Sequence, residues 1–163
     1  MLKEDPLVPL DLAGFNTTPV DQAATLLAGC LEVPRWVDTV LDGRPYPSLA
    51  ALRAVAAGIT LTPEEIRRAM AAHPRIGERP TALSRSEQSG VDSTAADRFR
   101  AANTEYEQRF GHVFLIRAAG RGGEEMLAAL RERMGNDPET ELAVAGRELV
   151  EIALLRLEKA VTA

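Results

Sequence analysis

Apolar residues recur at intervals of three or four along most of the chain, and this spacing predicts helices rather than strands. The first predicted helix is Val20–Cys30, with Thr18 as its N-cap and Pro19 at its first position. The other predicted helices run from Pro34 to a stop at Asp42-Gly43, over Leu49–Ala57, from Thr62 to Ala72 or His73, over residues 95–109, over residues 124–134, and from Asp137 to about Ala160.

Several predicted helix ends carry recognisable capping residues. Ser48 precedes one helix and Gly58 ends it. Thr62 and Glu65 have the spacing of a capping box, in which each side chain hydrogen-bonds to the other residue's backbone amide. Asp137 is placed to cap the last helix, whose apolar residues occupy a wide arc. These signals predict where the helices begin and end.

Two segments do not follow the helical pattern. Residues 73–92 form one irregular stretch, and residues 112–116 are typical of a short, buried, extended run. No internal repeat, linker or low-complexity block is visible in the sequence. We therefore predict an all-α fold: a single compact helical domain over residues 1–163, with about seven or eight helices and one irregular stretch.

Composition and charge exclude several classes of protein. Apolar residues make up 45% and charged residues 26% of the chain, which is ordinary for a globular protein. Because the chain has one cysteine and two histidines, an intrachain disulfide is excluded and a cysteine-based metal site is nearly so. The net charge of −5 argues against nucleic acid binding, and no apolar run is long enough to span a membrane. The start of the chain does not resemble a secretory signal, so we expect a cytoplasmic protein.

The irregular stretch carries the first candidate for chemistry, His73, at the end of a predicted helix. The negative end of the helix dipole favours the charged imidazole, and a histidine that titrates near neutrality can donate or accept a proton. The alternative is that His73 only caps the helix. Pro74 follows directly and ends the helix, because the residue before a proline disfavours the α conformation.

A second candidate lies further along the same stretch. If the backbone is helical there, Ser84, Glu87 and Gln88 share one face and could form a hydrogen-bonding wall for a small polar ligand. The alternative is a solvated face, with Ser84 capping a helix whose third residue is Glu87.

Two more candidates lie outside the irregular stretch. An extended backbone after Gly111 would offer N–H and C=O groups to an amide-rich or urea-like ligand, although a core strand or turn is the simpler interpretation. His112 in that segment is more often a packed or surface residue than a catalyst. Arg156 interrupts an apolar run, where it either extends to solvent or binds a ligand.

Together these pieces resemble the family of 2-oxo-4-hydroxy-4-carboxy-5-ureidoimidazoline (OHCU) decarboxylases, whose members complete the conversion of urate to (S)-allantoin. The matching pieces stand in order over nearly the whole chain: Ala72-His-Pro-Arg-Ile-Gly77, Ser84-x-x-Glu87-Gln88-x-Gly90, Asn103-x-x-Tyr106-x-x-x-Phe110-Gly111, Phe114-Leu-Ile116, Gly135-Asn136-Asp137 and Ile152-x-x-x-Arg156-Leu157. The resemblance implies an all-α homodimer that needs neither cofactor nor metal and acts on a small molecule.

The resemblance also implies roles for individual residues. His73 would be the main catalytic group, handling the proton or the substrate hydroxyl, and Glu87 would be its partner. The expected substrate-binding residues are Pro74, Ser84, Gln88, Leu115, Ile116, Arg117 and Arg156. Among these, the backbone of residues 115–117 would meet the ureido group, and Arg156 would hold a carbonyl or carboxylate oxygen.

The chain departs from the family pattern at two positions. His112 stands where many relatives carry phenylalanine, and Leu154 stands where a basic residue often precedes the Arg-Leu pair.

Two other functions remain open on the residues alone. One is a decarboxylase or hydrolase of another ureido or imidazole compound, and the other is a non-catalytic helical interaction domain.

Overall fold

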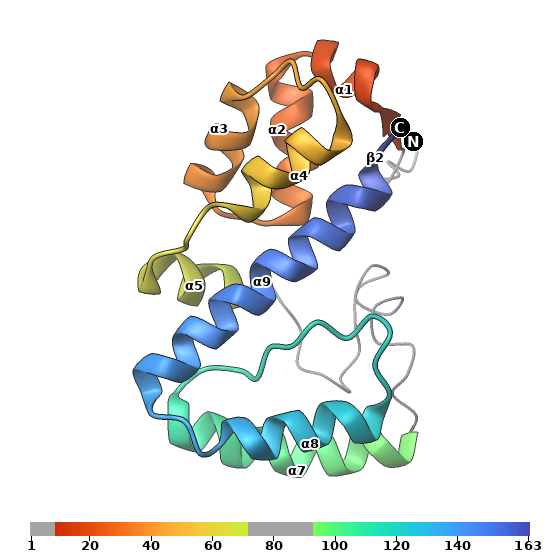
Figure 1. Ribbon diagram of the computed structural model, residues 1–163. Coiled ribbons are helices and arrows are strands. Elements are labelled where there is room, and N and C mark those ends of the chain that lie inside the picture. Colours follow the sequence, from red (N-terminus) through yellow and green to blue (C-terminus); the bar gives the residue numbers. More distant parts are fainter. Residues whose placement is uncertain (1–8, 72–92) are drawn as a thin grey trace, which may run out of the picture. The chain divides into compact units, whose positions relative to one another are not determined.

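A computed structural model describes residues 9–71 and 93–163, and these form eight helices and one very small sheet (Figure 1). The elements in chain order are β1 (Leu10–Asp11), α1 (Leu12–Thr17), α2 (Val20–Cys30), α3 (Pro34–Asp42), α4 (Leu49–Ala57), α5 (Pro63–Met70), α7 (Ser93–Phe110), α8 (Gly123–Arg133), α9 (Pro138–Ala160) and β2 (Val161–Thr162). The predicted all-α class is therefore confirmed.

The chain divides into two compact units. Unit 1 comprises Met1–Thr60 with Val150–Ala163, and unit 2 comprises Leu61–Leu149. The long helix α9 thus contributes residues to both units. That residues 1–163 act as one domain stays a prediction.

No helix within residues 9–71 and 93–163 combines the length and the apolar character needed to cross a membrane.

The predicted caps at Ser48, Thr62 and Asp137 are confirmed. The Ser48 hydroxyl accepts from the Ala51 amide at 3.1 Å. Thr62 and Glu65 form the complete capping box, with bonds of 2.9 and 3.2 Å. The Asp137 carboxylate accepts from the Thr140 amide at 2.7 Å, and this bond lowers the pKa of the Asp137 carboxyl. Short polar side chains therefore set these helix starts, as the sequence indicates.

The predicted cap at Thr18 is wrong, because the residue ends a helix that the sequence pattern did not reveal. Its amide donates to the Gly14 carbonyl at 2.8 Å and closes α1, whereas α2 begins at Val20 after Pro19, without a side-chain cap. Helix α1 is six residues long, too short to show a clear helical period. Its own cap is Asp11, which accepts from the Gly14 amide at 2.7 Å.

Unit 1 packs around Trp36 and Phe15, neither of which is exposed to solvent. The Trp36 indole N–H donates to the Ala56 carbonyl at 3.0 Å, so the aromatic ring also fixes α3 against α4. Tyr46 is buried in the turn between those helices, and its hydroxyl donates to the Val40 carbonyl at 2.7 Å. Strand β1 pairs in parallel with β2, Leu10 opposite Val161, which joins the two ends of unit 1.

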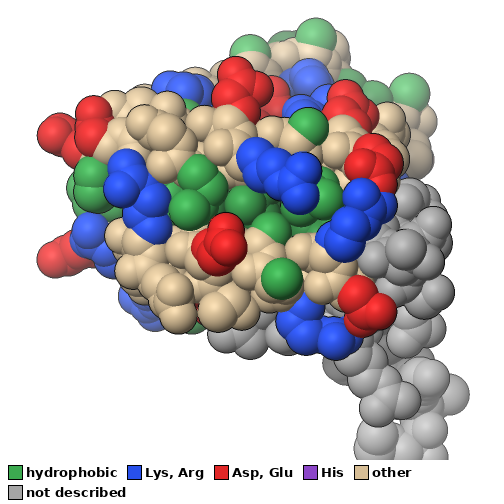
Figure 2. Space-filling view, turned by 90° about the horizontal axis from the view of Figure 1, so that it is seen from below, with side chains coloured by type: hydrophobic (Ala, Val, Ile, Leu, Met, Phe, Trp, Pro, Cys, Tyr) green, Lys and Arg blue, Asp and Glu red, His purple; other side chains and the backbone are tan. Residues whose placement is uncertain are grey.

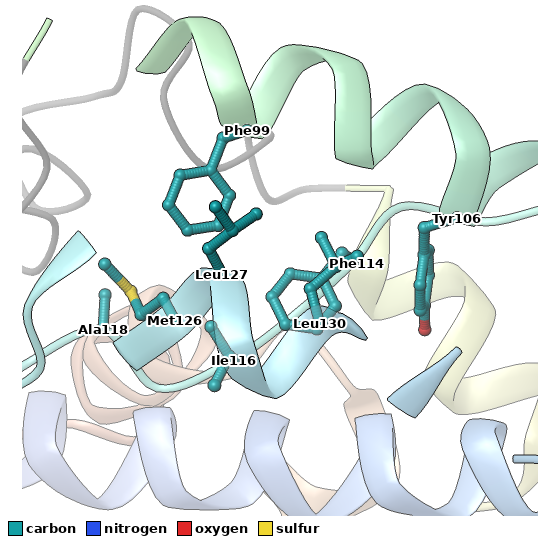
Figure 3. Packing of buried hydrophobic residues seen from close by; sticks show 8 residues of the cluster. All are labelled: Phe99, Tyr106, Phe114, Ile116, Ala118, Met126, Leu127 and Leu130. Atoms are coloured by element: carbon teal, nitrogen blue, oxygen red, sulfur yellow. The ribbon is translucent and has the colours of Figure 1, made fainter. Parts of the chain in front are cut away.

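Unit 2 is built around an apolar cluster between α7, α8 and the connection that links them (Figure 3). The buried members are Phe99, Tyr106, Phe114, Ile116, Ala118, Met126, Leu127 and Leu130. The Phe114 ring lies edge-on to the Tyr106 ring, with centroids 5.3 Å apart, a favourable geometry for an aromatic pair. The helices and the connection therefore share one core.

The surface on the side of α7 and α8 carries side chains of both charges, with hydrophobic side chains between them (Figure 2). Arg98 pairs with Glu124, and Arg100 pairs with Asp97 at 3.3 Å. Because all four side chains are exposed, these pairs contribute little to stability. A mixture of both signs is typical of a solvated surface rather than of the basic stripe that binds nucleic acid.

Replacement of Gly43 by alanine should destabilise the protein by about 1–3 kcal/mol. A Cβ atom at this position would lie 2.6 Å from Tyr46 Cζ, so the ring would have to leave its bond to Val40. Gly29→Ala is the matched control: it lies in α2 with open space around it, and should stabilise by about 0.5–1 kcal/mol. Urea unfolding measures both changes, and a Gly43→Ala protein as stable as wild type would contradict the packing described here.

Candidate active site

The residues predicted for the site fall into three groups in the structure. His73, Pro74, Ser84, Glu87 and Gln88 lie outside the described residues, so their arrangement stays a prediction. Leu115, Ile116 and Arg117 lie in unit 2, on the connection between α7 and α8, and Arg156 lies on α9 within unit 1. Within the described residues, the predicted site therefore comprises the connection with its supports in unit 2, and Arg156 in unit 1.

The connection after Gly111 is neither helix nor strand, and its middle is buried. Gly111 takes a φ of +78°, which glycine adopts without strain, and this ends α7. Phe114, Leu115 and Ile116 are each at most 4% exposed, which confirms the predicted buried run over these three residues. His112 and Val113 are only half-buried.

The side chains of the connection alternate between two environments. Phe114, Ile116 and Ala118 belong to the cluster with α7 and α8, whereas Leu115 and Arg117 do not. A period of two is the pattern of an extended chain, in which successive side chains point to opposite faces. The connection therefore presents one face to the aromatic core and the other away from it.

A buried carboxylate, Glu141, is the centre of the hydrogen bonds in unit 2. It is 0% exposed and accepts from Arg133 Nε at 2.9 and 3.1 Å and from Arg133 Nη2 at 2.5 Å. It also accepts from the Tyr106 hydroxyl, and from Asn136 Nδ2 at 3.1 Å. A buried charge of this kind is tolerated only when it is paired and hydrogen-bonded, and both conditions are met here.

Arg133 links this carboxylate to the connection. Two of its nitrogens face Glu141, and its Nη1 donates to the Leu115 carbonyl at 2.8 Å. The guanidinium carbon also lies 4.5 Å from the centre of the Phe114 ring, within the range of a cation–π contact. One side chain thus binds the carboxylate of α9, the backbone of the connection and an aromatic ring of the core.

Tyr106 is held as a neutral hydrogen-bond donor. Burial, followed by the bond to the Glu141 carboxylate, raises the pKa of the Tyr106 hydroxyl well above its ordinary value. The phenol therefore keeps its proton at physiological pH and serves Glu141 rather than acting as a base.

A second carboxylate, Glu148, binds the connection from α9. Its Oε1 accepts from the Arg117 backbone N–H at 2.9 Å. The side chain is only half-buried, so Glu148 costs less to desolvate than Glu141. Two groups of the predicted site backbone, the Leu115 carbonyl and the Arg117 amide, are thus bound by side chains of the protein itself.

Arg156 is 9% exposed, so it does not extend into solvent as one interpretation of the sequence allowed. Its charge acts on the buried thiol of Cys30, whose pKa is raised by burial, partly offset by Arg156, to about 12. A thiol with that pKa is neutral at physiological pH and is a poor nucleophile. Cys30 is therefore a buried, neutral thiol that supplies no nucleophile.

Unit 1 also contains an apolar hollow of about 380 Å³. Its lining residues are Leu49, Ala50, Leu52, Arg53, Leu154, Leu157, Glu158, Val161, Thr162 and Ala163. Arg53 and Glu158 pair with each other there. Of the predicted site residues that the structure describes, Leu115, Ile116, Arg117 and Arg156, none lines the hollow. The hollow also offers few polar groups to a polar ligand.

Among the described residues, no group of three or more histidine, cysteine, aspartate or glutamate side chains could hold a metal ion.

The family model for OHCU decarboxylase matches residues 16–158. The chain belongs to the OHCU decarboxylase family. This match covers most of both units and includes every residue that the sequence analysis placed in the site.

Two curated relatives of the family show how much of the chain is shared. The 2-oxo-4-hydroxy-4-carboxy-5-ureidoimidazoline decarboxylase of Amia calva is 29% identical over 163 residues, which cover 91% of this chain and 93% of that protein. The uric acid degradation bifunctional protein TTL of Arabidopsis thaliana is 39% identical over 103 residues, which cover 56% of this chain. The matched region spans about a third of the length of such bifunctional relatives, 32% in the Arabidopsis protein.

A member of the OHCU decarboxylase family with a known crystal structure has a similar fold. The crystal structure of OHCU decarboxylase in the presence of (S)-allantoin covers 81% of this chain and 94% of its own, with a TM-score of 0.67 and 29% identity. The similarity thus extends over nearly the whole of that protein.

The roles of Arg133, Glu141 and Glu148 in this OHCU decarboxylase family member were not predicted from the sequence. A signal was present for the first two, because each charged residue continues an apolar stripe. Arg133 follows Met126 and Leu130 at helical spacing, and Glu141 precedes Ala145 and Leu149 in the same way. Glu148 also lies at helical spacing between two apolar residues, Ala145 and Ile152, but its side chain is only half-buried.

Removal of the buried carboxylate should be costly. We expect Glu141→Ala to lower the free energy of unfolding by about 3–5 kcal/mol, because Arg133 would be left as a buried charge without its counter-ion. Glu139→Ala is the control, since Glu139 lies in the same first turn of α9 but is exposed; a change of about 0.5 kcal/mol or less is expected. Urea unfolding followed by circular dichroism separates the two, and equal losses would contradict the role of Glu141.

Proposed function

We propose that the chain decarboxylates OHCU to (S)-allantoin in the degradation of uric acid, without a cofactor. The observation that carries the proposal is the match to the family model over residues 16–158. The 29% identity to a crystal structure obtained in the presence of (S)-allantoin supports it, because the shared fold covers 94% of that chain.

The reaction itself explains why no cofactor would be needed. The carboxylate of OHCU is attached to a carbon next to a ring C=N bond. When the bond to the carboxylate breaks, its electron pair moves into that imine, and CO₂ leaves. The substrate thus performs the task that pyridoxal phosphate or thiamine diphosphate performs in other decarboxylases. The protein has to orient the carboxylate out of the ring plane, exclude water and deliver a proton to one face.

We assign the roles as the family resemblance implies. His73 handles the proton or the substrate hydroxyl, with Glu87 as its partner, and Pro74, Ser84 and Gln88 shape the pocket. The backbone of residues 115–117 binds the ureido group, and Arg156 holds a carbonyl or carboxylate oxygen. The burial of Leu115, Ile116 and Arg156 supports this assignment, because polar recognition is strongest where water is excluded.

We further propose that the protein works as a homodimer in the cytoplasm, with a small molecule and not a nucleic acid as its ligand. The net charge of −5 argues against nucleic acid as a ligand, since a polyanion would be repelled.

Light scattering tests the dimer: it should report twice the chain mass of 17.6 kDa, and a value of 17.6 kDa would reject it.

The purified protein should accelerate the formation of optically pure (S)-allantoin from freshly generated OHCU. The His73→Ala variant should lose at least about 10²-fold in kcat, the usual contribution of a general acid or base. Circular dichroism of the product measures both the rate and the handedness.

Racemic allantoin formed at the uncatalysed rate by the wild-type protein would reject the proposed function. Wild-type rates in His73→Ala would remove His73 from its role but leave the reaction assigned. The control is Gly29→Ala, a change in open space on α2 that should leave kcat unaltered.

A further inference from the structure

The backbone of residues 115–117 is held on one edge by side chains of two helices. Arg133 of α8 donates to the Leu115 carbonyl at 2.8 Å, and Glu148 of α9 accepts from the Arg117 amide at 2.9 Å. In an extended chain the N–H and C=O groups of a residue point to the same edge, and those of the next residue point to the opposite edge. The two bonded groups, two residues apart, therefore share an edge.

The N–H and C=O groups of Ile116 consequently point to the opposite edge of the connection. The burial pattern supports this geometry, because Phe114, Ile116 and Ala118 alternate with Leu115 and Arg117 between core and non-core faces. Within residues 9–71 and 93–163, no group forms a hydrogen bond with the Ile116 N–H or C=O. A donor and an acceptor on one edge are the complement of a ureido group, which also carries N–H and C=O groups side by side.

Arg133 can hold the connection accurately because its own orientation is fixed. Its Nε and Nη2 are directed at Glu141, which accepts further bonds from Tyr106 and Asn136. With two nitrogens fixed by a buried carboxylate, the planar guanidinium presents Nη1 to the Leu115 carbonyl in one direction only. Tyr106 and Asn136 thus stabilise the orientation of Arg133 through Glu141.

We infer that Arg133, oriented by Glu141, and Glu148 are positioning residues that set the Ile116 peptide edge for hydrogen bonding to the ureido group of the substrate. None of them has to touch the substrate. The inference rests on the proposed function. It adds residues that determine how tightly the substrate binds, rather than how fast the bound substrate reacts.

The test is to measure kcat and KM for OHCU with four variants. Arg133→Lys keeps the charge but cannot bind Glu141 and Leu115 together, and Glu148→Ala removes the acceptor for Arg117. Each should raise KM by about fivefold or more with kcat within about twofold, the signature of lost binding alone. Glu148→Gln keeps an acceptor oxygen and should restore KM to within about twofold of wild type.

Arg44→Lys is the matched control for Arg133→Lys. Arg44 also donates Nη1 to backbone carbonyls, those of Phe15 and Thr18, both at 2.8 Å, and also lies over an aromatic ring, but it belongs to unit 1. It should lower the melting temperature without changing KM. The comparison separates positioning of the connection from loss of stability.

An unchanged KM in both Arg133→Lys and Glu148→Ala overturns the inference. A decrease in kcat alone, in proportion to the decrease in melting temperature, also overturns it. If Arg133→Lys does not fold, the Glu148→Ala and Glu148→Gln pair decides on its own. A wild-type protein without activity would overturn the proposed function and this inference together, whereas an active wild type with unaltered variants overturns the inference alone.

Discussion

The requirement to compensate one fully buried carboxylate, that of Glu141, organises unit 2. An unpaired carboxylate in this position would cost several kcal/mol, so donors have to converge on it from different parts of the chain. They come from α7 through Tyr106, from α8 through Arg133, and from the turn before α9 through Asn136. The same carboxylate therefore determines how three helices and the α7–α8 connection fit together.

This arrangement has a consequence for the proposed chemistry. A decarboxylation in which the substrate accepts its own electrons asks the protein mainly for precise orientation and for a dry environment. A connection without regular structure is ordinarily mobile, since it lacks the hydrogen bonds of a helix or sheet. Here Arg133 and Glu148 replace those bonds, and the core side chains Phe114 and Ile116 anchor the segment from the other side.

Much of the fold could be predicted from the sequence because its signals are local. The helical spacing of apolar residues and the caps at Ser48, Thr62 and Asp137 act over a few residues. The prediction failed at Thr18, where the same residue type can begin or end a helix and only the neighbouring α1 decides. The sequence predicted one compact domain, and it gave no sign of the two compact units, because these depend on contacts between distant segments.

The supports of the site could not be predicted for a similar reason. Glu141 and Arg133 stand out only as charges on apolar stripes, and their pairing depends on how α8 and α9 approach each other. Glu148 resembles any half-exposed glutamate on a helix, since its partner is a backbone amide 31 residues away. Residue patterns can thus nominate a ligand-binding backbone, but they do not reveal which side chains hold it.

The most direct measurement is a crystal structure of this protein with (S)-allantoin bound. We expect the ureido group to be hydrogen-bonded to the Ile116 main chain, while Arg133 still donates to the Leu115 carbonyl and Glu148 still accepts from the Arg117 amide. Allantoin bound away from residues 115–117, or bound there only after Arg133 has released Leu115, would contradict it.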